Sequence, residues 1–122
     1  MLINNAATAS GLSADTIRFY AKSGMLPPIA RDARGWRDFS PSDVDWLKTL
    51  KHLRATGMPL PEIKRFAQSA HAADADTPAN RQMRLQIMQR HAHTLARRQT
   101  ELDACAQYLA HKIALYSGTK ED

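Results

Sequence analysis

The C-terminal third of the chain is its longest stretch without a helix-breaking residue, and it limits what the chain can fold into. Thr77 and Pro78 have the residue types of a helix N-cap and first helical position, and no glycine or proline follows before Gly118. A helix of about 39 residues spans roughly 58 Å, which is too long to fold back onto so small a domain. We therefore expect this helix to need a partner.

Apolar side chains recur along this predicted helix with the alternating three- and four-residue spacing of a coiled coil. Nothing else in the chain is long enough to cover this seam, so we expect a homodimer. Gln99 is polar and lies about midway, where it could meet its own copy and set the register of an antiparallel pair. The seam consists of Leu85, Met88, Ala92, Leu95, Gln99, Leu102, Ala106, Leu109, Ile113 and Tyr116.

The chain is basic, and the excess of positive charge lies in its N-terminal part. Its 122 residues, about one domain's worth, include 17 Lys and Arg against 12 Asp and Glu, a net charge of +5. Residues 1–73 carry 10 basic and 6 acidic side chains, whereas residues 74–122 carry 7 and 6. This balance indicates a polyanionic partner at the N-terminal part, with nucleic acid or an anionic membrane as the candidates.

Several other classes are disfavoured by what the sequence lacks. No run of about 18 apolar residues and no signal peptide is present, which argues against a membrane protein. Cys105 is the one cysteine, which excludes an intramolecular disulfide framework and is typical of a cytoplasmic protein. An enzyme is disfavoured because the chain has no Gly-rich phosphate loop and no nucleophile with a neighbouring base.

Residues 1–24 predict two short helices joined by a tight turn. Gly11 follows an Ala-rich segment at the position of a helix C-cap, and Ser13 can cap a second helix over residues 14–22. Gly24 ends that helix. This pattern favours a helix-turn-helix. The side chains expected on the outer face of the second helix are Thr16, Arg18, Phe19 and Lys22, and those expected to face inward are Ile17 and Tyr20.

Residues 29–39, which we call the wing, contain three arginines and are compatible with a small β-hairpin turning near residues 33–35. Ser40, Pro41 and Asp43 then predict the start of a helix that ends near Ala55, and a further helix follows from "PLPEI" to about Ser69. The expected organisation is a domain over residues 1–73, a linker over residues 74–77, a dimerisation helix over residues 78–118 and a tail over residues 119–122.

These features together resemble the MerR-type bacterial transcription regulators, and the resemblance covers nearly the whole chain in order. The family's helix-turn-helix is similar to AATASGLSADTIRFYAKSGMLPP, and its wing and second helix pair are similar to ARGWRDFSPSDVDWLKTLKHLRATGMPLPEIKRF. The resemblance implies a mainly α fold, with a winged helix-turn-helix domain followed by a long helix that forms an antiparallel coiled coil. It also implies a mechanism in which promoter DNA with an overlong spacer is untwisted for RNA polymerase when a signal arrives.

The resemblance also implies DNA-binding roles for the second helix and the wing. Arg18 and Phe19 are expected nearest the base edges and the backbone, and Arg37 is expected to hold a phosphate, since arginine donates bidentately to guanine or phosphate. The alternative for Phe19 and Tyr20 is a place in the core. Phe19 and Ala21 stand where the family usually has a tyrosine and an acidic residue. The expected DNA-binding residues are Ser13, Thr16, Arg18, Phe19, Tyr20, Lys22, Arg34 and Arg37.

The signal is the least constrained part of this interpretation. The family's metal sensors use cysteines near the dimer helix, and this chain has none at those places, so we expect no metal and no cofactor. Cys105 has two interpretations, as a small side chain beside the dimer interface or as a reactive thiol that senses electrophiles. A small-molecule effector would need a pocket built from residues 71–76, the fourth helix and the partner's long helix.

The leading interpretation is a sequence-specific transcriptional regulator that binds a pseudo-palindromic promoter operator as a homodimer. Its partners would be double-stranded DNA, a second copy of the chain and RNA polymerase. Two alternatives are a coiled-coil adaptor for other proteins, which would need no wing arginines, and a nonspecific architectural DNA-binding protein, which would need no dimer helix.

Overall fold

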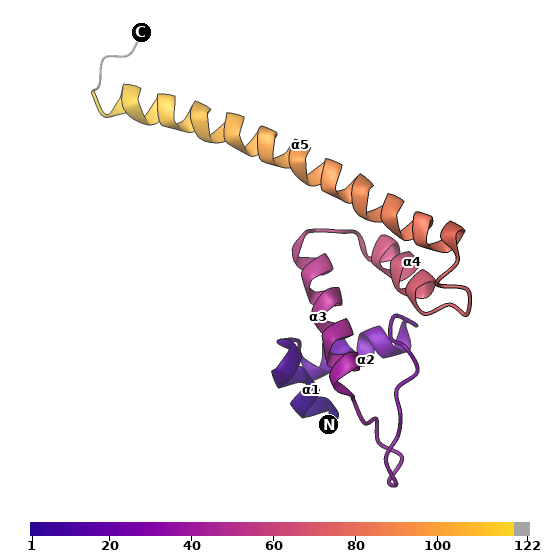
Figure 1. The fold of residues 1–122 in the computed structure, drawn as a ribbon. Helices are drawn as coiled ribbons and strands as arrows, with labels where there is room; N and C mark the ends of the chain where they lie inside the picture. The colour runs from indigo at the N-terminus through magenta and orange to yellow at the C-terminus, as the bar shows by residue number, and fades with distance from the viewer. Residues whose placement is uncertain (119–122) are drawn as a thin grey trace. The chain divides into compact units, whose positions relative to one another are not determined.

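The computed structural model describes residues 1–118, which fold as five helices without a named strand (Figure 1). The expected mainly α fold is confirmed. The expected tail over residues 119–122 lies outside the described residues. The helices are α1 (Ile3–Ser10), α2 (Ala14–Lys22), α3 (Pro41–Ala55), α4 (Leu60–Ala70) and α5 (Pro78–Tyr116).

The turn between α1 and α2 depends on a glycine and a serine. Gly11 has a φ of 77°, in the left-handed region, and its N–H donates to the Ala7 carbonyl at 2.9 Å. A side chain on Gly11 would meet only the mobile ammonium end of Lys51 from α3, so it is the positive φ that favours glycine at this position. Ser13 then caps α2 by accepting from the Thr16 N–H at 3.0 Å. The predicted start and end of α2 are both confirmed.

The core of the N-terminal part lies where α1, α2 and α3 meet. Ala6 from α1, Ile17 from α2 and Val44 and Leu47 from α3 form one buried cluster with Phe39, the last residue of the wing. Ile17 is fully buried, and Tyr20 is 2% exposed, so both face inward as expected. Burial of the α2 side that carries Ile17 leaves its opposite side free for a ligand.

The wing is a narrow loop that projects from the helices, and its expected hairpin is reduced to a single antiparallel bridge between Arg31 and Arg37 (Figure 1). Two further backbone hydrogen bonds join its sides, from Asp38 N–H to the Ala30 carbonyl at 2.7 Å and from Asp32 N–H to the Trp36 carbonyl at 2.8 Å. No third strand lies beside this bridge to extend the sheet, and two strands alone are marginally stable in water. The expected hairpin is therefore short.

Side-chain hydrogen bonds define the start of the second helix pair. Ser40 and Asp43 form a capping box at the start of α3, with Ser40 Oγ accepting at 3.1 Å and Asp43 Oδ2 accepting at 2.9 Å. Helix α4 starts after Pro59 without a side-chain cap and ends at Ala70, one residue beyond the predicted end. The capping box therefore fixes where the chain leaves the wing and becomes helical.

The connection between α4 and α5 is held by the first turns of α5. Arg84 donates to the Ser69 carbonyl at 3.1 Å and to the Ala75 carbonyl at 3.0 Å, so one side chain joins the end of α4 to the connection. Thr77 caps α5 by accepting from the Asn80 N–H at 3.3 Å, as expected. Residues Met1–Ile87 form one compact unit, so the first turns of α5 belong with the N-terminal helices.

Helix α5 is continuous for 39 residues and ends at Tyr116, two residues before Gly118. Along its C-terminal part the seam side chains are exposed, with Leu102 at 68% and Ile113 at 67%. No helix in the described part of the chain is both long and apolar enough to cross a membrane. The exposed seam is the feature of α5 that a partner would have to cover.

We expect Ser40→Ala to lower the free energy of unfolding by about 1 kcal/mol, because α3 would lose the serine half of its capping box. Ser42→Ala is the matched control, since Ser42 is exposed in the first turn of the same helix, and its effect should stay within about 0.5 kcal/mol. Urea unfolding followed by circular dichroism measures both. Equal effects of the two substitutions would show that the capping box does not stabilise α3.

Candidate nucleic-acid interface

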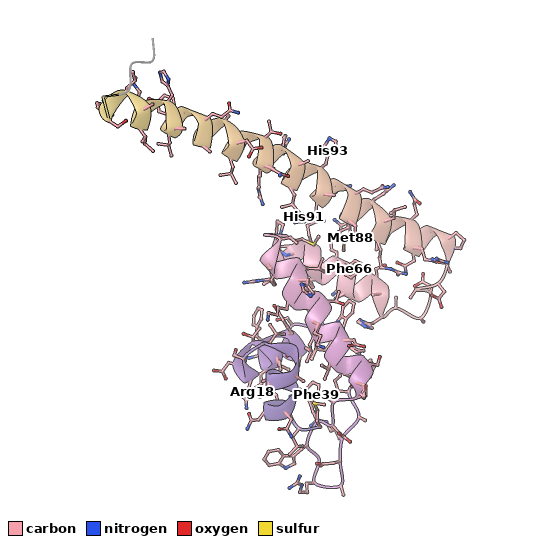
Figure 2. All side chains as sticks on the ribbon, turned by 60° about the vertical axis from the view of Figure 1, so that its left-hand side comes forward. Arg18, Phe39, Phe66, Met88, His91 and His93 are labelled. Carbon is pink, nitrogen blue, oxygen red and sulfur yellow. The ribbon has the colours of Figure 1, made fainter. Side chains whose placement is uncertain are left out.

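Four arginines meet in a hollow between α2 and the wing. The hollow has a volume of about 350 Å³ and no acidic residue in its lining. Arg18, labelled in Figure 2, lines it from α2, and the other three arginines line it from the wing. We call this site the wing hollow, and its positive charge suits an anion such as a phosphate. Its lining consists of Ile3, Arg18, Arg31, Arg34, Gly35, Trp36 and Arg37.

Arg18 is the arginine of the wing hollow that α2 supplies. Its Nη1 donates to Asp15 Oδ1 at 2.9 Å, one turn earlier on the same helix, and both side chains are more than half exposed. An exposed ion pair of this kind contributes little stability, about 0–1 kcal/mol, so a base edge or a phosphate can compete for the guanidinium. Arg18 therefore pairs only weakly with Asp15 and remains available.

The wing arginines differ in how much of their bonding capacity the wing itself uses. Arg31 Nη1 donates to the Gly35 carbonyl at 2.7 Å and so closes the loop. Arg34 pairs with Asp32 at 3.4 Å and lies over the exposed Trp36 ring, 5.6 Å from its centroid. Within residues 1–118, Arg37 has no carboxylate within ion-pair distance. Arg37 thus has the free donors that a phosphate contact needs.

Asp32 organises the tip of the wing. Its Oδ1 accepts from the Arg34 N–H at 2.9 Å and from the Trp36 N–H at 3.0 Å. These hydrogen bonds, above all the one from Trp36, together with the Arg34 charge hold the pKa of Asp32 below its ordinary value, against a smaller opposing effect of burial. One carboxylate therefore sets the positions of the two neighbouring side chains that line the wing hollow.

The sequence-predicted residues of α2 lie in different surroundings. Phe19 is 46% exposed, which favours its binding role over a place in the core, whereas Tyr20 is buried. Burial raises the pKa of Tyr20, and the nearby Arg54 charge partly offsets this effect. Thr16 and Ser13 hydrogen-bond each other through their hydroxyls at 2.8 Å. Lys22 is exposed in the last turn, and neither Lys22 nor Ser13 lines the wing hollow.

Three residues that line hollows beside α2 were not among the DNA-binding residues predicted from the sequence. Arg31 and Trp36 lie in the same short basic run as the two predicted wing arginines, and that run was the available signal. Arg54 lies in the last turn of α3 and lines a second hollow with Asp15, Thr16, Phe19 and Tyr20. No local pattern points to Arg54, because only the packing of α3 brings it to α2.

The long helix carries the chain's one thiol. Cys105 is exposed on α5. Among the described residues, no group of three or more His, Cys, Asp or Glu side chains could hold a metal ion. Both interpretations of Cys105, as a small side chain beside the dimer interface and as a reactive thiol, stay predictions.

Comparisons with known proteins agree on one family. The family model "MerR HTH family regulatory protein" matches residues 1–70, and the model "MerR, DNA binding" matches residues 44–112. An uncharacterized HTH-type transcriptional regulator of Haemophilus influenzae is 38% identical over 115 residues, which cover 94% of this chain and 82% of that protein.

Solved structures give the same result. HiNmlR, described as a MerR family regulator lacking the sensor domain and bound to promoter DNA, is similar with a TM-score of 0.79 and 34% identity, covering 96% of this chain and 90% of that one. A putative MerR family transcriptional regulator from Listeria monocytogenes has a TM-score of 0.82 and 26% identity, covering 96% and 86%.

We expect Asp32→Ala to speed amide exchange at Arg34 and Trp36 about tenfold, because both N–H groups lose their acceptor. Asp32→Asn is the matched control, since it removes the same charge but keeps an acceptor oxygen, and it should exchange more slowly than the alanine variant. NMR measures both. In the wild type the pKa of Asp32 is lowered, so the stability that its carboxylate contributes is complete above the ordinary pKa of 3.8. That stability is lost only as the pH falls through the lowered pKa. Identical exchange in the two variants would contradict this role for Asp32.

Proposed function

The chain belongs to the MerR family of helix-turn-helix regulatory proteins, and from this premise we propose that it binds a pseudo-palindromic promoter operator as a homodimer and distorts the DNA between its half-sites in response to a signal. Its relatives are transcriptional regulators, and the chain is a DNA-binding transcriptional regulator rather than an enzyme. The binding of promoter DNA by HiNmlR supports the same kind of target here.

The wing hollow is the observation that carries the proposal. Its four arginines gather beside the exposed surface of α2, and within residues 1–118 only Arg18 and Arg34 are paired with carboxylates, those of Asp15 and Asp32, which lie outside its lining. A helix that enters the major groove brings its flanks close to the phosphates, and arginines placed there fix the position of the helix. The wing arginines of the hollow therefore supply the backbone contacts, and α2, with Arg18, supplies the base contacts.

The roles of individual residues follow from their positions. Arg18 is exposed on α2 and has the geometry to donate two hydrogen bonds to a guanine edge. Phe19 is exposed beside it and suits an apolar contact with a thymine methyl or a sugar. Arg37 is the wing residue that we assign to a phosphate, with Arg34 as a second contact. Tyr20 supports the helix from the buried side, and its hydroxyl is less accessible than the family resemblance implies.

The homodimer is proposed from the seam of α5. A second copy would bury the exposed leucines, and each fully buried leucine contributes about 1.5–3 kcal/mol. A two-fold axis through an antiparallel pair of α5 helices would give each dimer two copies of α2, so the operator would be an inverted repeat. We propose that bending or untwisting of the DNA between the half-sites then sets the promoter geometry for RNA polymerase in the cytoplasm.

Selection from a random-sequence pool of duplexes tests this function. The full-length protein is incubated with the pool at physiological salt, and bound duplexes are recovered and sequenced. We expect an inverted repeat with two half-sites whose centres lie about one helical turn, or a multiple of it, apart. Recovery of sequences without a shared motif would contradict sequence-specific regulation and leave nonspecific architectural binding.

We expect Arg18→Ala and Arg37→Ala to weaken operator binding in different ways. Arg18→Ala should cost about 1–3 kcal/mol and relax the preference at one base pair of each half-site, because a base contact is lost. Arg37→Ala should weaken all sequences alike and reduce the salt dependence by about one unit, because a phosphate contact is lost. Fluorescence anisotropy at several salt concentrations measures both, and equal effects on operator and random DNA in both variants would contradict the assignment.

A further inference from the structure

The first turns of α5 carry two separate faces. Asn80, Arg84 and Ile87 are three or four residues apart, so they share one side of the helix, and Ile87 on that side is 3% exposed. Successive residues turn by about 100°, so Leu85, the first residue of the seam, points about 100° away from Arg84. Leu85 is 48% exposed. One face of α5 is therefore turned toward its own chain, and the seam stays open to a second copy.

Hydrogen bonds join the inward face of α5 to the end of α4. Ser69 lies in the last turn of α4 and is 4% exposed. Arg84 Nη1 donates to the carbonyl oxygen and to the hydroxyl oxygen of Ser69, each at 3.1 Å. The Ser69 hydroxyl in turn donates to Asn80 Oδ1, one turn earlier on α5. Two side chains of α5 thus hold the same buried residue of α4.

The same two side chains also hold the connection between the helices. Arg84 Nη2 donates to the Ala75 carbonyl at 3.0 Å. Asn80 Nδ2 donates to the Asp74 carbonyl at 3.3 Å and to the Asp74 carboxylate at 3.1 Å. We call this group of residues the α4–α5 clamp, and it consists of Ser69, Asp74, Ala75, Asn80 and Arg84. The clamp joins three consecutive segments of the chain through two side chains of α5.

The guanidinium of Arg84 suits the end of a helix. The last carbonyl groups of a helix have no partner within it and carry partial negative charge. Within residues 1–118 no carboxylate lies within ion-pair distance of Arg84, so the carbonyl oxygens of Ser69 and Ala75 balance its charge. A guanidinium is planar, and its nitrogens point in fixed directions. Donation from both Nη atoms therefore fixes the orientation of the side chain as well as its distance.

A polar joint of this kind specifies one arrangement of the two helices. Ser69 is buried, and Asn80 and Arg84 are half-buried, so a group that loses its partner there is not simply resolvated. A small rotation of α5 on α4 would break the Arg84 hydrogen bonds to Ser69 and Ala75 together. The direction in which α5 leaves α4 is therefore fixed more sharply than burial of Ile87 alone would fix it.

The length of α5 converts this direction into a distance along DNA. Fifteen residues separate Arg84 from Gln99, which lies about midway along the seam, and they span about 23 Å. A change of about 10° at the clamp would move Gln99 by about 4 Å. In a symmetric dimer the second copy would move by about twice as far, which is about two base-pair steps of roughly 3.4 Å.

We propose that Arg84 is a positioning residue that determines which distance between half-sites the dimer accepts. It acts by fixing the direction in which α5 leaves α4, without touching DNA. A stiff clamp also means that the DNA, rather than the protein, adapts when the operator spacing and the protein spacing differ. This inference rests on the proposed function, because it needs a dimer formed through α5 and an operator with two half-sites.

The first test varies the operator spacing. Duplexes carry the half-sites that the wild type selects, with the spacer lengthened or shortened by one to three base pairs, and fluorescence anisotropy measures each affinity. We expect the wild type to lose about tenfold or more for one base pair, because the DNA must bend or twist to compensate. Arg84→Met keeps most of the side-chain length without the donors, and its loss should be at least about threefold smaller. A profile as steep as that of the wild type would overturn the proposal.

Two further variants separate position from charge. Arg81→Met is the matched control, because Arg81 is exposed on the same part of α5, and it should keep the wild-type spacing profile. Arg84→Lys keeps the charge but cannot donate from two fixed nitrogens, so its profile should lie between those of the wild type and Arg84→Met. Equal flattening in Arg81→Met, or a wild-type profile in Arg84→Lys, would contradict the positioning role.

Binding to a duplex with a single half-site distinguishes positioning from folding. The α2 and wing residues are unchanged in Arg84→Met, so we expect its affinity for one half-site to stay within about twofold of the wild type. Loss of half-site binding together with a lower thermal midpoint would mean that Arg84 only stabilises the fold. If Arg84→Met does not fold, Asn80→Ala removes the other side chain of the clamp, and a wild-type spacing profile in Asn80→Ala would overturn the proposal.

These measurements separate the inference from the function on which it rests. If the wild type selects no motif, sequence-specific regulation itself is wrong and the inference falls with it. If the wild type selects an inverted repeat with a fixed spacing and Arg84→Met keeps that spacing preference, only the role of Arg84 is wrong.

Discussion

The exposure of the apolar α5 seam to water is the constraint on which the rest of the protein depends. Leu102, Leu109 and Ile113 are each more than half exposed on a helix of 39 residues. An isolated helix with such a stripe is not stabilised by its own packing, because amphipathic helices gain most of their stability from an apolar partner. Covering the seam with a second copy would stabilise α5 and would also give the protein two recognition helices. The same contact between copies would therefore support both the fold and DNA recognition.

In the N-terminal part, contacts within the protein order the proposed DNA-binding surface of α2 and the wing before DNA binds. Ile17 anchors α2 in the core, and Ser13 fixes where the helix begins. Asp32 holds the backbone of the wing tip, and Asp15 holds Arg18 on α2. These contacts reduce the conformational freedom that the basic side chains would lose on binding. The acidic residues beside the arginines therefore position the positive charge more than they oppose it.

Much of this arrangement could be predicted from the sequence, because helix ends are set by local chemistry. Ser13, Ser40 and Thr77 are caps that need only their neighbours, and Gly11 needs only the left-handed turn that it makes. The rest depends on contacts between distant residues. Arg54 reaches α2 only through the packing of α3, and the Arg84 hydrogen bonds cross the connection to α4. The reduction of the wing to one bridge reflects the absence of a neighbouring strand, which no local pattern signals.

The mass of the protein in solution shows whether α5 pairs with a second copy of the chain. Sedimentation equilibrium at micromolar concentration, with Leu102→Glu as a variant that places a charge in the seam, reports whether α5 binds a second copy. We expect a wild-type mass of twice the chain's 13.6 kDa, and a shift toward the monomer mass in Leu102→Glu. A folded wild-type protein that sediments at 13.6 kDa would contradict the dimer, and with it the symmetric operator.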